Sequence, residues 1–135
     1  MRKVMVFVFV GVLAAALMLA ACGGGASQPA SSSGARGDAA AGKALFSQAV
    51  IGSNPGCSTC HSLEPGKTLV GPSLAGVASR AGSRVAGLSA EQYIRQSILE
   101  PDAYTVPGFQ KGVMIKEQLT DQQVNDLVAF LMTLK

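Results

Sequence analysis

Two cysteines and a histidine stand together near the middle of the chain. Cys57 and Cys60 are three residues apart and His61 follows directly, in the run CSTCH. This spacing is typical of a c-type haem attachment site. Two cysteines one helical turn apart can each bond one vinyl group on the same edge of a porphyrin, and the adjacent histidine then reaches the iron. The sequence therefore predicts one covalently attached haem c, and with it the carriage of electrons.

Other uses of a Cys-x-x-Cys pair fit the chain less well. A structural zinc ion needs four thiolate or imidazole ligands, whereas the chain has three cysteines and one histidine, and Cys22 lies far away in an apolar leader. A thioredoxin-type pair is expected between a strand and a helix, but the flanks here are rich in Gly and Pro or show helical periodicity. Assigning His61 to iron removes the usual general base of a hydrolase, so we expect no enzymatic activity.

Residues 1–21 have the layout of an export signal. Arg2 and Lys3 precede an apolar run, Val4–Ala21, that ends in small residues. The run LAAC ending at Cys22 looks like a lipobox, in which this cysteine becomes an acylated N-terminus and the acyl chains anchor the protein. An uncleaved signal anchor is the alternative, because the 18 apolar residues are just enough to span a bilayer. Either way we expect an exported, membrane-anchored protein at the outer face of the cytoplasmic membrane or in the periplasm.

A low-complexity stretch separates this leader from the remainder. Residues 22–37 begin with the acylated cysteine and continue with nearly nothing but Gly, Ser, Ala and Pro. Such a stretch cannot bury itself, so we expect a flexible tether with a root-mean-square reach of about 20 Å. Residues 38–135 then form the one globular domain.

A first helix is expected to begin after Asp38, whose side chain can cap it. Its apolar positions follow the helical period. These positions are Leu45, Phe46, Ala49 and Val50, with Gly42 on the same face.

Two capping boxes mark further helices. Ser89 and Gln92 start a middle helix, which Pro101 stops. Thr120 and Gln123 start a last helix. Its apolar stripe comprises Val124, Leu127, Val128, Leu131 and Leu134. Because no strand pattern alternates along the domain, the sequence predicts an all-α fold.

Several motifs together resemble class I cytochrome c over the whole globular part. They are Gly42–Phe46, Cys57–His61, the run GPSL from Gly71, a lone downstream Met114, and Leu127–Leu131 with Phe130. The resemblance implies three to five helices packed round one covalent haem, with the first and last helices crossing at Gly42. Residues 93–101 and 108–114 particularly resemble small bacterial cytochromes fused to, or serving, haem–copper oxidases.

The axial ligands of the iron follow in part from the residues. His61 is the expected proximal ligand, and the resemblance nominates the carbonyl of Pro72 as the acceptor for its second ring nitrogen. A soft thioether is expected opposite, and outside the leader only Met114 and Met132 offer one. Met114 is favoured because it lies in a loop, whereas Met132 belongs to the apolar last helix. One departure from the family pattern is Ile115, where relatives often have proline.

The net charge is +3 and falls to +1 when Arg2 and Lys3 are removed with the leader, so overall charge says little about partners. Between residues 67 and 116, however, there are six basic residues and only three acidic ones. The basic residues are Lys67, Arg80, Arg84, Arg95, Lys111 and Lys116, and the acids are Glu91, Glu100 and Asp102. Scattered solvated charge and a basic docking face both remain open.

These observations favour a membrane-tethered electron carrier that moves single electrons from a quinol-oxidising complex toward a terminal oxidase. A fixed haem subunit of such a respiratory complex is the alternative. A haem peroxidase or gas sensor is a third, in which a weak methionine bond lets peroxide or a diatomic gas reach the iron, and it rests on Ile115 and little else. Redox proteins and the membrane are the expected partners, with no nucleic acid and no small-molecule substrate.

Overall fold

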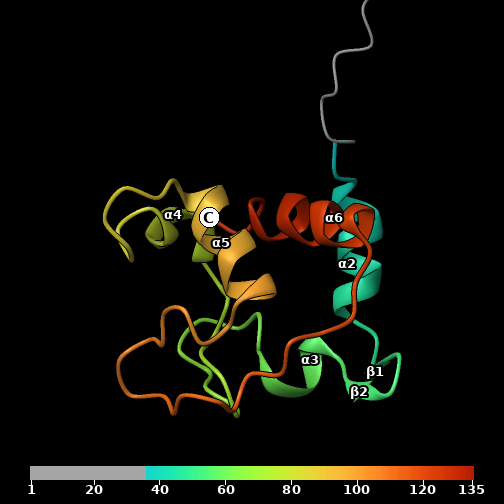
Figure 1. The fold of residues 1–135 in the computed structure, drawn as a ribbon, viewed down its shortest axis with the longest axis horizontal. Coiled ribbons are helices and arrows are strands. Elements are labelled where there is room, and N and C mark those ends of the chain that lie inside the picture. The colour runs from blue at the N-terminus through green and yellow to red at the C-terminus, as the bar shows by residue number, and fades with distance from the viewer. Residues whose placement is uncertain (1–35) are drawn as a thin grey trace, which may run out of the picture. The chain divides into compact units, whose positions relative to one another are not determined.

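Five helices and one short hairpin make up the regular structure of residues 36–135 in the computed structural model, which describes this part of the chain (Figure 1). The helices are α2 (Ala39–Phe46), α3 (Cys57–Cys60), α4 (Val77–Ala81), α5 (Ala90–Leu99) and α6 (Asp121–Leu131). The hairpin consists of β1 (Val50–Ile51) and β2 (Asn54–Pro55), antiparallel, with Val50 opposite Pro55. The predicted export signal, Cys22 and the tether as far as residue 35 lie outside the described residues.

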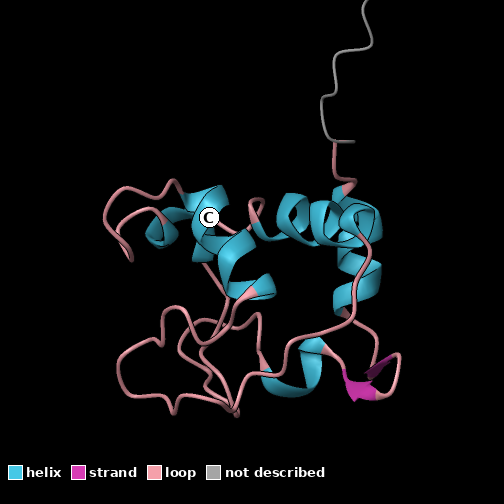
Figure 2. Cartoon of the chain, in the orientation of Figure 1, coloured by secondary structure: helices cyan, strands magenta, loops and turns pink. Residues whose placement is uncertain are grey.

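Loops and helices dominate this part of the chain, and the hairpin is its single patch of sheet (Figure 2). The predicted all-α class is therefore confirmed for residues 36–135, with the two-residue strands as a local exception. Among these helices, none combines the length and the apolar character that a membrane crossing requires.

The three predicted helix starts are confirmed. The Asp38 carboxylate accepts hydrogen bonds from the amides of Ala40 and Ala41 at 2.7 and 3.2 Å, which caps α2. Capping boxes close at the starts of α5 and α6, where Ser89 and Thr120 each accept from the amide three residues later. These side chains satisfy amides that have no partner inside the helix.

The end of the first helix differs from the prediction. α2 ends at Phe46, so Ala49 and Val50 do not continue its apolar face, and Val50 lies in β1 with 58 % of its surface exposed. The reason is a tight turn: Gly52 adopts a left-handed φ of +60°, which suits a two-residue hairpin loop. The Ala49 carbonyl then accepts from the Gly56 amide at 2.8 Å instead of continuing a helix.

α2 and α6 cross closely (Figure 1). A Cβ atom built on Gly42 would overlap the backbone carbonyl of Asp126, so only glycine permits this approach. The rings of Phe46 and Phe130 lie beside the crossing with centroids 5.6 Å apart. The buried Asp126 carboxylate accepts from the Asp38 amide at 2.7 Å, which ties the start of α2 to α6.

The apolar core gathers on the helices of this crossing and on α4 and α5. Its buried members are Leu45, Phe46, Ile51, Val77, Ala81, Tyr93, Ile94, Val124, Leu127, Val128, Phe130 and Leu131. Leu134, predicted in the stripe of the last helix, lies beyond the end of α6 and packs half-buried against this core. The helices thus cover one side of a cavity, and α3 with the long loops 62–76 and 100–119 forms the other.

Candidate functional site

The single turn of α3 presents both cysteines of the predicted attachment site. Cys57 begins the helix and Cys60 ends it, and both are free, half-buried thiols in the lining of the cavity. The start of α3 is held by the preceding segment, because the Thr59 hydroxyl donates to the Ala49 carbonyl at 3.2 Å. Burial raises the pKa of the Cys57 thiol, against the opposing effect of a backbone hydrogen bond.

His61 follows α3 directly, and its ring is oriented by one hydrogen bond. Its Nδ1 lies 2.9 Å from the carbonyl oxygen of Pro72. Since a carbonyl can only accept, Nδ1 carries the proton and Nε2 keeps its lone pair for a metal. Burial lowers the pKa of His61, and the bond to the Pro72 carbonyl opposes this only in part. A neutral imidazole with a free Nε2 is the form that ligates iron.

The GPSL run supplies the wall behind this histidine. The Gly71 amide donates to the Cys60 carbonyl at 2.9 Å, which draws the run against α3. A Cβ atom on Gly71 would overlap the imidazole ring, so glycine is needed for the close approach. The sequence resemblance pointed to the carbonyl of Pro72, and the fold does bring it to His61.

The cavity in front of His61 has the size and chemistry of a cofactor pocket. Its volume is about 490 Å³, and pockets of this kind span about 300–1,000 Å³. Side chains from the helices line one side of it, among them Phe46, Tyr93, Ile94, Leu127 and Leu131. Two thiols and a free imidazole nitrogen on one wall, facing an apolar lining, fit a haem bonded through thioethers.

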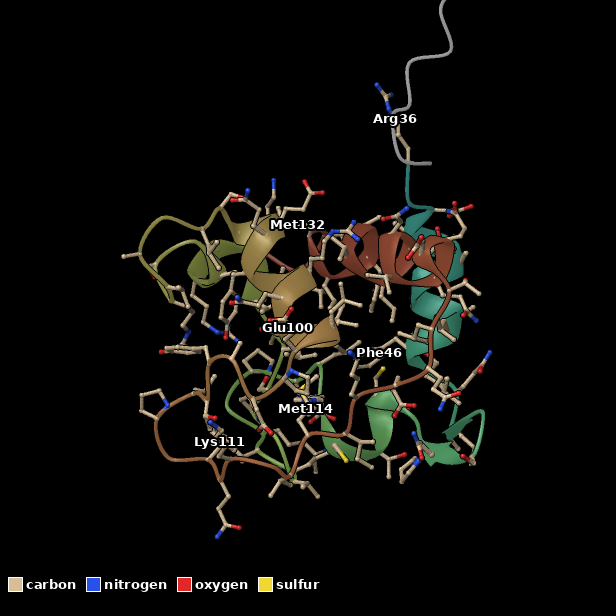
Figure 3. The ribbon with its side chains drawn as sticks, viewed as in Figure 1. Arg36, Phe46, Glu100, Lys111, Met114 and Met132 are labelled. Atoms are coloured by element: carbon tan, nitrogen blue, oxygen red, sulfur yellow. The ribbon has the colours of Figure 1, made fainter. Side chains whose placement is uncertain are left out.

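Met114 and Met132 occupy different surroundings. Met114 lies in the loop between α5 and α6, lines the cavity, and has 42 % of its surface exposed. Met132 caps the end of α6, packs half-buried against the core and is absent from the cavity lining. Figure 3 shows Met114 near the middle of the domain, among the loops below α5, and Met132 at its upper edge. The fold therefore brings the thioether of Met114, and not that of Met132, to the cavity that holds His61.

The sequence did not single out Arg80 and Glu117 as part of this site, although both line the cavity. Arg80 was grouped with surface charges, yet its guanidinium donates to the backbone carbonyls of Ser73 and Ala75 and is half-buried. Glu117 lies close enough to Cys57 for its charge to contribute to the raised pKa of that thiol. α4 is one five-residue turn, too short for a periodic pattern that would have shown which way Arg80 points.

Part of the predicted basic segment is engaged within the domain. Lys67 pairs with Glu64 at 2.8 Å, and Arg95 donates to the Asn125 side chain at 2.6 Å. With Arg80 turned to the cavity, Lys111 and Lys116 are the exposed cations nearest Met114 in the sequence. A basic docking face would therefore consist of fewer residues than the charge count suggests.

Comparison with known proteins gives one match. A model of the family described as Cytochrome c matches residues 39–135, which is most of the chain. A search of curated proteins finds no relative that matches. The matched region begins at the first residue of α2 and contains every residue of the site described above.

Proposed function

Since the chain belongs to the cytochrome c family and so carries haem c on Cys57 and Cys60, we propose that it is a membrane-tethered electron carrier whose iron is held between His61 and Met114. Members of this family are generally electron carriers rather than enzymes. One observation carries the proposal for the iron: both cysteines, His61 and Met114 line a single cavity.

Four residues of the cavity have distinct parts in holding the cofactor. His61 offers Nε2 to the iron while the Pro72 carbonyl keeps its ring in one tautomer. Met114 offers a soft thioether from the loop between α5 and α6. Arg80 brings a positive charge to the lining, where it can pair with the carboxylates of the porphyrin. When bound, haem supplies the one-electron couple of its iron.

Two protein ligands suit electron transfer better than catalysis. With His61 and Met114 in place no coordination position remains for a substrate. A histidine–methionine pair also raises the reduction potential relative to two histidines, which suits late steps of respiration.

A redox titration followed by visible spectroscopy tests the ligand assignment. Met114→Ala should lower the reduction potential and let the reduced protein bind carbon monoxide at neutral pH, because the sixth position opens. The matched variant Met132→Ala should keep the wild-type potential and bind no carbon monoxide. The assignment is wrong if the reduced Met132→Ala protein binds carbon monoxide at the sixth position and the Met114→Ala protein does not. Carbon monoxide binding by the unaltered protein would instead favour a gas sensor or peroxidase.

The proposed location depends on Cys22, which lies outside the described residues. We expect cleavage before Cys22, acylation of its amine and thiol, and anchoring at the outer face of the cytoplasmic membrane. Mass spectrometry of the purified protein should show a lipidated start at this cysteine, and Cys22→Ser should release the domain or leave the leader uncleaved. A start at Met1 without lipid would instead identify an uncleaved anchor.

The proposed partners are a quinol-oxidising complex as donor and a terminal oxidase as acceptor. Support comes from the resemblance of residues 93–101 and 108–114 to oxidase-associated cytochromes and from the predicted tether. Purification in mild detergent tests whether the protein moves between them. A carrier should leave both complexes on a sizing column, whereas a stable stoichiometric complex would identify a fixed subunit.

A further inference from the structure

The loop that carries Met114 has little regular structure to hold it. Residues 100–119 connect α5 to α6 without a helix or strand, and residues 110–116 are all exposed. Gly108 and Gly112 adopt left-handed φ angles of +91° and +77°. The residue after Met114 is Ile115, so proline does not stiffen the loop there. Something else must keep the thioether at the cavity.

Two side-chain hydrogen bonds hold this loop on either side of Met114. On one side, the Asp102 carboxylate accepts from the Gly112 amide at 2.7 Å, which closes the loop on itself. On the other, the Asn54 amide donates to the Glu117 carboxylate at 3.2 Å. Gly112 is two residues before Met114, and Glu117 is three residues after it.

The second bond ties the loop to the haem attachment site. Asn54 belongs to β2, which lies directly before Gly56 and the start of α3. It is 63 residues from Glu117 in the chain, so the bond joins the segment before Cys57 to the segment after Met114. The segment before the attachment site and the segment that carries Met114, both in the lining of the cavity, are thereby linked through side chains.

Met114 lines both the cavity and an open groove, to which Asp102 and Lys116 also contribute. It is 42 % exposed, so a small molecule in solvent can approach this segment of the loop. Movement of the loop would leave the sixth position of the iron open to such a molecule.

We propose that Asp102 and Glu117, the latter through Asn54, are positioning residues that keep Met114 on the iron in place of a proline after the ligand. The inference rests on the proposed function, since it takes Met114 as the sixth ligand. Loss of either hydrogen bond makes the loop open more often while the helical core stays intact, because both bonds lie outside that core.

Binding of imidazole to the oxidised protein measures this opening. Imidazole occupies the iron only after the Met114 thioether leaves; one lone pair replaces another and no electron is exchanged. Since one hydrogen bond changes an opening equilibrium by about three- to ten-fold, Asp102→Ala and Asn54→Ala should each tighten apparent imidazole affinity by about that factor. Asn54→Ala leaves the charge of Glu117 in place, so its effect is not one of a removed charge.

Three further variants sharpen the test. Asp102→Asn keeps an acceptor oxygen for the Gly112 amide. Its imidazole affinity should therefore lie between those of the wild type and Asp102→Ala. Glu64→Ala removes an exposed carboxylate bond in another loop, to Lys67, and should leave the imidazole affinity within about two-fold of the wild type. Met114→Ala should bind imidazole far more tightly than any of them.

The outcomes separate this inference from the ligand assignment. If Met114→Ala leaves imidazole affinity unchanged, the ligand assignment fails. If Met114→Ala tightens it but Asp102→Ala and Asn54→Ala do not, the ligand stands and the positioning role is refuted. Thermal unfolding of the same holoproteins identifies a merely structural effect. If imidazole affinity rises in proportion to the loss of melting temperature in every variant, Glu64→Ala included, the positioning role is also refuted.

Discussion

The crossing of α2 and α6 makes a sharp prediction for Gly42→Ala. The added Cβ atom would overlap the backbone carbonyl of Asp126 and approach Cβ of Phe130 to 2.9 Å. A carbonyl inside a helix cannot rotate away, so the two helices must separate. Overpacking of this kind costs about 1–3 kcal/mol, and the contact between Phe46 and Phe130 is weakened as well.

An opposing effect must be subtracted from this cost. Alanine is better than glycine inside a helix by about 1 kcal/mol. Because the obstacle is backbone, we take the upper end of the overpacking range and expect a net loss of about 2 kcal/mol in the free energy of unfolding. For a domain of this size, 1 kcal/mol corresponds to about 4–8 °C, so the melting temperature should fall by about 8–16 °C.

Thermal unfolding of the oxidised holoprotein, followed by far-UV circular dichroism, measures this change. Gly82→Ala is the matched control, because Gly82 has a helical φ of −68° and a Cβ atom there would meet its nearest neighbour at 3.4 Å. The control should be neutral or stabilising by up to about 1 kcal/mol. The reasoning is refuted if Gly42→Ala melts within about 2 °C of the wild type, or if both variants lose stability equally.

Gly71→Ala places a Cβ atom on the His61 ring and should lower the yield of haem-loaded protein several-fold, read from Soret absorbance per chain; a yield equal to that of Gly82→Ala would contradict this. Serine at both positions of the Cys-x-x-Cys pair should leave a domain without a cooperative thermal transition, because haem completes a small core, and a sharp native-like transition in that haem-free protein would show otherwise. Lys111→Gln with Lys116→Gln should slow electron exchange with an acidic redox partner at low ionic strength, and the difference should vanish in high salt; rates of the unaltered protein that do not change with salt would rule out electrostatic steering.

Helix starts could be predicted because their causes are local. Asp38 and the capping boxes at Ser89 and Thr120 act on amides two or three residues away, so the sequence spacing contains the whole interaction. The end of α2 could not be predicted in the same way. There the apolar period ran on to Val50, but a glycine turn and a hydrogen bond from Gly56 to Ala49 redirected the chain.

The residues of the site also differ in whether local sequence or the fold reveals them. The thiols and His61 occupy five consecutive residues, so their chemistry was visible without a fold. The choice between the two methionines rested on an argument about loops, and only the cavity lining shows that Met114 shares the space of His61. Arg80 was misjudged because a short helix gives no indication of which side chains point inward.

By itself, the sequence determined that the chain binds haem c, that its domain is helical and where three of its helices begin, because covalent attachment and helix capping act over a few residues. The tertiary structure decided which groups meet across the cavity. The Pro72 carbonyl reaches His61 across 11 residues, and Asn54 reaches Glu117 across 63. Such pairs depend on the path of the whole chain between them, which no local pattern of residues specifies.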